Sequence, residues 1–117
     1  MTAELDEGAF AVLAERTLAH CAEAVEEQAP DFEVDFESGI LTIETADGAI
    51  FLLNRHAPLR QLWLSSPQSG AGHFAYDAAE GDWKSTRGGD SLQPFLEREL
   101  SGAAGQTIVL DPWPVTQ

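Results

Sequence analysis

Two stretches of the chain repeat apolar residues at the three- and four-residue spacing of an amphipathic helix. The first runs from about residue 8 to residue 28, and Pro30 ends it. The second runs from about residue 91 to residue 101, with Asp90 as the expected N-cap and Gly102 at its end. Each helix has one apolar stripe, so we expect each to pack that stripe against another layer.

The chain between the helices shows the shorter period of β-strands. Ser38-Gly39 and Asp47-Gly48 are turn signals, and the second is of the hairpin type. The expected strands are 31–37, 40–45, 49–54, 59–65, 73–77 and 82–86. The order helix, five or six strands, helix predicts an α+β fold. We expect a two-layer α-β sandwich with both helices on one face of an antiparallel sheet.

Length and cysteine content limit the organisation of the protein. The 117 residues predict a single domain, and two prolines predict an irregular tail over residues 111–117. Cys21 is the only cysteine, which excludes an internal disulfide and a cysteine-cluster metal site. Its place in the apolar stripe of the first helix predicts a buried core residue.

Location can also be inferred from the sequence. No apolar run reaches the roughly 18–20 residues of a membrane span, and the first residues lack the basic start of a targeting peptide. We therefore expect a cytoplasmic protein with no membrane association.

Acidic residues dominate the charge and are unevenly distributed. The formal net charge is −14, and residues 1–54 hold thirteen of the twenty acids but one base. Nucleic-acid binding through phosphates needs clustered Lys and Arg, so this charge excludes it. Cations and basic protein surfaces are the partners that such a charge attracts.

Residues 23–37 concentrate this charge, and no base lies between Arg16 and Arg55. The helical acids lie where the helix dipole disfavours anions, so stability alone does not explain them. Carboxylates suit hard cations, but strand acids about 6.5–7 Å apart cannot chelate one ion directly. We expect weak binding of an ion that helix and strand share, or that is held through water. The alternative is a solvated surface that protects a sheet edge from aggregation.

A second candidate lies in residues 54–70. Alternation places Leu62 and Leu64 on the helix side of the sheet, and Gln61 and Trp63 on the other side. An exposed tryptophan with polar neighbours is typical of an interface anchor. The alternative is a Trp63 covered by a loop or by the tail. No nucleophile motif accompanies the chain's Ser, His and Asp residues, so we expect no catalytic residues.

These residues resemble a known family. The most specific block comprises Asn54-Arg55, Pro58, Gln61, Trp63 to Pro67 and Ser69-Gly70. Gly39 to Ile43, Tyr76-Asp77, Trp83 and Gly89 to Leu92 support it. With them, the chain resembles the bacterial members of the frataxin family from Phe10 to about Leu110.

The resemblance implies a role in iron-sulfur cluster assembly. It implies a surface that binds iron (Fe²⁺ or Fe³⁺) weakly, where other divalent cations can substitute, and that docks on a cysteine desulfurase. The implied metal-binding residues are Glu23, Glu26, Glu27, Asp31, Glu33 and Asp35. It also implies that the exposed sheet contacts the desulfurase and the scaffold protein through Asn54, Gln61 and Trp63.

Three functional hypotheses remain at this point. The first is a non-enzymatic regulator and adaptor of the desulfurase–scaffold complex. The second is an iron carrier or store, with ferrous oxidation after assembly. The third is an acidic interaction module without a metal role. We expect a monomer, with metal-dependent oligomerisation as the alternative.

Overall fold

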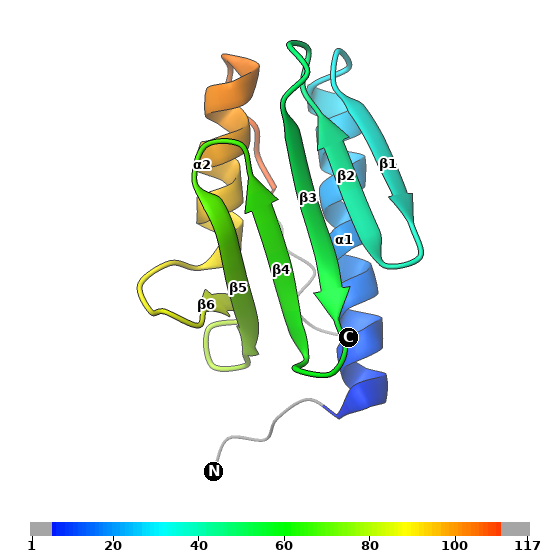
Figure 1. Ribbon diagram of the computed structural model, residues 1–117, viewed down its shortest axis with the longest axis vertical. Helices are drawn as coiled ribbons and strands as arrows, with labels where there is room; N and C mark the ends of the chain where they lie inside the picture. The colour runs from blue at the N-terminus through cyan, green and yellow to red at the C-terminus, as the bar shows by residue number, and fades with distance from the viewer. Residues whose placement is uncertain (1–5, 111–117) are drawn as a thin grey trace.

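The computed structural model describes residues 6–110, and the predicted irregular tail lies outside them. Along the chain, one helix precedes six strands and a second helix follows them, as the sequence pattern predicts (Figure 1). The helices are α1 (Glu7–Gln28) and α2 (Leu92–Ala104). The strands are β1 (Glu33–Glu37), β2 (Ile40–Glu44), β3 (Ile50–His56), β4 (Gln61–Ser66), β5 (Gly70–Asp77) and β6 (Asp82–Ser85).

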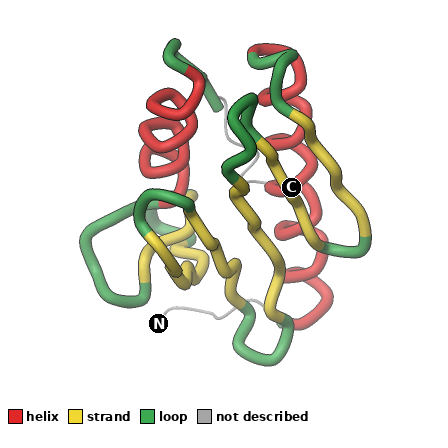
Figure 2. Tube along the Cα trace, turned by 45° about the horizontal axis from the view of Figure 1, so that its top comes forward, coloured by secondary structure: helices red, strands yellow, loops and turns green. Residues whose placement is uncertain are grey.

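The strands form one antiparallel sheet in the order β1-β2-β3-β4-β5-β6, so each strand pairs with its neighbour in the chain. Both helices cover the same face of this sheet (Figures 1 and 2). The predicted two-layer α-β sandwich is therefore confirmed. We call the sheet face away from the helices the open face. Neither helix within residues 6–110 is long and apolar enough to cross a membrane.

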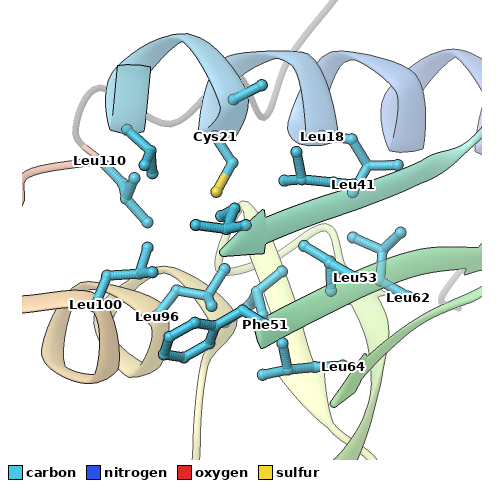
Figure 3. Packing of buried hydrophobic residues seen from close by; sticks show 14 of the residues in the cluster. Leu18, Cys21, Leu41, Phe51, Leu53, Leu62, Leu64, Leu96, Leu100 and Leu110 are labelled. Carbon is cyan, nitrogen blue, oxygen red and sulfur yellow. The ribbon is translucent and has the colours of Figure 1, made fainter. Parts of the chain in front are cut away.

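Apolar side chains from both layers meet between the helices and the sheet. Leu18 and Cys21 extend from α1, Leu53 and Leu62 from the sheet, and Leu96 from α2 (Figure 3). All five are buried, which confirms Cys21 as a core residue. Burial raises the pKa of the Cys21 thiol to about 12, so the sulfur stays protonated and unreactive at neutral pH.

The segment after α2 closes the core between the two helices. Ile108 and Leu110 are buried there. The Gln28 side chain donates to the Val109 carbonyl (2.6 Å) and accepts from the Val109 amide (2.8 Å). The Leu110 amide donates to the Glu97 carboxylate (2.8 Å). These bonds supply the backbone partners that an irregular buried segment needs.

Helix α2 differs from the prediction at both ends. Ser91, and not Asp90, is the N-cap, and the carboxylate of Asp82 accepts from the Gln93 amide (3.2 Å). The helix continues past Gly102 to Gly105, whose φ of 70° ends it in the left-handed conformation. A glycine inside a helix costs about 1 kcal/mol. The partly buried Ala103 and Ala104, which pack on the core, offset that cost.

Strand β5 begins at Gly70, earlier than the predicted residue 73, because the preceding turn is tight. The Ser66 hydroxyl accepts from the amides of Gln68 (3.1 Å) and Ser69 (3.2 Å). Ser66 also donates to the buried Glu99 carboxylate on α2 (2.6 Å), and the Ser69 hydroxyl donates to its other oxygen (3.0 Å). This network ties the β4–β5 turn to α2 and fixes the start of β5.

Ser66→Ala should lower the free energy of unfolding by about 2 kcal/mol, because it leaves two amides and a buried carboxylate without their partner. Urea unfolding measures the change. The control is Ser65→Ala, which alters the exposed neighbour and should stay within about 0.5 kcal/mol of the parent. Equal decreases in the free energy of unfolding of the two variants would show that the network does not stabilise the fold.

Candidate functional site

The six acids expected to bind metal lie along one edge of the molecule, and all six are exposed. They come from the last turns of α1, from the connection that follows, and from β1, which is an edge strand of the sheet. We call this set the acidic edge: Glu23, Glu26, Glu27, Asp31, Glu33 and Asp35. The structure thus leaves these carboxylates in contact with solvent, where cations and basic partners can reach them.

The acids of β1 and those of α1 face different sides of the edge. Val34 and Phe36 pack against the core on the helix side of the sheet. Side chains alternate along a strand, so Glu33 and Asp35 extend from the open face. Glu23, Glu26 and Glu27 belong to α1, which lies in the helix layer behind the sheet (Figure 1). The acidic edge is therefore a broad negative surface that wraps around β1.

A further acid joins this surface through the sheet register. Glu44 on β2 lies directly opposite Glu33, and both side chains are exposed. Opposed residues in antiparallel strands have Cβ atoms about 5 Å apart, so these two carboxylates repel each other. The sequence analysis missed Glu44. Counting outward from the two-residue turn Ser38-Gly39 would have found it.

The donor set of the acidic edge limits how it can hold a metal ion. Within residues 6–110, no group of three or more His, Cys, Asp or Glu side chains is placed to bind a single ion. Carboxylates acting singly or in pairs suit a hydrated hard cation that keeps most of its water. The arrangement therefore fits weak and exchangeable binding.

The open face carries the second candidate site. Asn54 on β3 and Trp63 on β4 are opposite each other in the register, and Gln61 lies opposite His56. The Gln61 side chain accepts from the Trp63 indole N–H (2.8 Å). Trp63 is partly exposed, as predicted, and it borders a shallow depression of about 160 Å³. The depression is also lined by Leu52, Asn54, Leu64, Ser65, Ala71 and His73.

Two histidines enclose the Trp63 ring. The His56 ring stacks on one side, with 3.8 Å between ring centroids and 7° between planes. The His73 ring, directly opposite Trp63 in the β4–β5 register, stacks at 4.3 Å and 13°. The sequence analysis missed this stack, because the spacing of the histidines along the chain shows no pairing. Registers counted across the β3–β4 and β4–β5 turns would have brought the three rings together.

The residue types of a hydrolytic triad are not assembled in the described part of the chain. The Ser66 hydroxyl bonds the Glu99 carboxylate, and His73 stacks on Trp63. Asp77 accepts from the Ala79 amide (2.9 Å) in the β5–β6 turn. Each of these groups therefore has a structural partner of its own.

Comparison with known proteins identifies the family of this chain. A family model for the frataxin-like domain matches residues 3–106. The chain belongs to the frataxin-like family. It is 41% identical over 103 residues to the iron-sulfur cluster assembly protein CyaY of Thioalkalivibrio sulfidiphilus. That match covers 86% of this chain and 95% of the CyaY protein.

Solved frataxin structures share the fold of this frataxin-like chain. Frataxin from Psychromonas ingrahamii matches with a TM-score of 0.80 and 26% identity, covering 91% of this chain and 98% of that chain. A trimeric yeast frataxin from Saccharomyces cerevisiae, complexed with ferrous iron, matches with a TM-score of 0.70 and 26% identity. That match covers 91% of this chain and 92% of the yeast chain.

Glu44→Gln should raise the melting temperature by roughly 1–3 °C at low salt, because it removes the repulsion between Glu44 and Glu33. The gain should shrink in high salt, where exposed charges are screened. Glu37→Gln is the control, since it removes an acid of the same surface that lies opposite Ile40. If the melting temperature rises equally in both variants, the cause is the lower overall charge and not the opposed pair.

Proposed function

We propose that this frataxin-like protein regulates iron-sulfur cluster assembly by docking on a cysteine desulfurase–scaffold complex in an iron-dependent way. The observation that carries the proposal is the continuity of two surfaces. The acidic edge reaches the open face through Glu33 and Asp35, and the same face holds the Trp63 site three strands away. The similarity to the iron-sulfur cluster assembly proteins CyaY supports the same pathway.

The acidic edge has two roles in this proposal. A one-sided negative field accelerates encounter with a basic protein surface and orients the approach. The same carboxylates attract Fe²⁺, a hard cation that they hold with water completing its coordination. Iron bound there neutralises part of the field, so docking responds to the iron concentration. The yeast frataxin complexed with ferrous iron supports iron as the cation.

The Trp63 site provides the anchor for docking. A partly exposed tryptophan beside a shallow apolar depression offers a large contact area that a partner side chain can complete. Gln61 and Asn54 add polar groups around it. The acidic edge therefore raises the association rate and orients the approach, whereas Trp63 lowers the dissociation rate.

A second function, iron carriage or storage after assembly, is favoured by one observation. The yeast frataxin complexed with ferrous iron is trimeric. The donor set of residues 6–110 argues against a tight store, because it holds no three-ligand group. We therefore place regulation first and enzymatic oxidation of iron last.

Desulfurase turnover, followed as sulfide release with scaffold present, tests the regulatory role across an iron titration. We expect this protein to change the rate and the size of the change to depend on iron. The double variant Glu26→Gln/Glu27→Gln should need roughly three- to tenfold more protein for the same effect, because it weakens the field. The matched control is Glu7→Gln/Glu15→Gln on the same helix. A rate that never responds to the protein would refute the regulatory role.

Trp63→Ala should weaken binding to the desulfurase–scaffold complex by about thirtyfold, the loss typical of a truncated anchor. The variant should still fold, with a stability loss of about 1–2 kcal/mol from the missing ring contacts. Isothermal calorimetry measures the affinity. Val12→Ala removes an exposed apolar side chain from α1 and should leave the affinity unchanged. Comparable losses in the two variants would rule out Trp63 as the anchor.

A further inference from the structure

His56 and His73, which stack on the two sides of Trp63, have no role in the function proposed above. The three rings come from three successive strands, β3, β4 and β5, which lie side by side in the sheet (Figure 1). The imidazoles lie nearly parallel to the indole, at 3.8 and 4.3 Å between centroids. Both faces of the indole are therefore covered, and a partner meets its edge and the adjoining depression.

This arrangement restricts the motion of Trp63. A surface tryptophan can rotate about two side-chain bonds, and fixing it on binding costs affinity. Here the two rings prevent rotation to either side, while Gln61 holds the indole N–H (2.8 Å). The His56 ring is itself held, because its Nδ1 accepts from the Leu59 amide (3.3 Å). The Trp63 side chain is therefore already ordered in the free protein, so it loses less conformational entropy when a partner binds.

We propose that His56 and His73 are positioning residues that hold Trp63 in its docking orientation. This inference rests on the proposed function, because it concerns the same desulfurase–scaffold contact. It assigns the order of the anchor to two side chains that the proposed function leaves without a role.

The test measures affinity for a purified desulfurase–scaffold complex. His56→Ala/His73→Ala should bind about tenfold more weakly than the parent, because the anchor is no longer ordered. His56→Phe/His73→Phe restores flat rings on both sides of the indole and should bind within about twofold of the parent.

Two results would overturn the inference. Parent-like affinity of the double Ala variant would show that the histidines do not position Trp63. A double Phe variant that binds as weakly as the double Ala variant would show that stacking of flat rings does not order the anchor. Trp63→Ala separates the inference from the function, since an unchanged affinity in that variant would refute the anchor itself.

A measurement on the free protein does not depend on the partner. The heteronuclear NOE of the Trp63 indole N–H should fall in His56→Ala/His73→Ala, because the ring becomes mobile, and should recover in His56→Phe/His73→Phe. An unchanged NOE in the double Ala variant would contradict the proposed positioning. Thermal unfolding of each variant confirms that the fold is retained.

Discussion

Burial of one sheet face against two helices is the constraint on which the other features depend. Because Val34, Phe36, Leu62 and Leu64 must face α1 and α2, the residues between them must face solvent. A shift of one residue in any strand would exchange these two sets. The register therefore positions the acids of β1 and the ring of Trp63 on the same open face. The binding surfaces follow from the packing of the core.

Repulsion within the acidic edge destabilises the folded protein, and no contact within the part of the chain that the structure describes compensates for it. Helical acids lie near a negative dipole end, and Glu33 and Glu44 are opposed across β1 and β2. Such repulsion is lowered when a cation or a basic surface approaches. A protein with this surface is thus more stable when bound than when free. That coupling is our reason for proposing weak iron binding and protein docking by the same residues.

Much of this arrangement could be predicted from the sequence, since helical and strand periodicities are local. The order of elements, the partly exposed Trp63 and the buried Cys21 all followed from such patterns. The start of β5 and the N-terminal end of α2 could not, because they depend on Glu99 and Asp82, which are distant in the chain. The C-terminal end of α2 depends on the packing of Ala103 and Ala104 against the core. The stack around Trp63 required the registers of two hairpins and the orientation of its rings. Whether the acidic edge binds iron stays a prediction.

The central claim is that the one-sided charge steers this protein onto a basic partner. The most direct measurement is the association rate with the desulfurase–scaffold complex, followed by stopped flow from low to high ionic strength. Electrostatic steering predicts a rate that falls at least tenfold as salt screens the acidic edge. A rate that stays constant across the same range would contradict the claim.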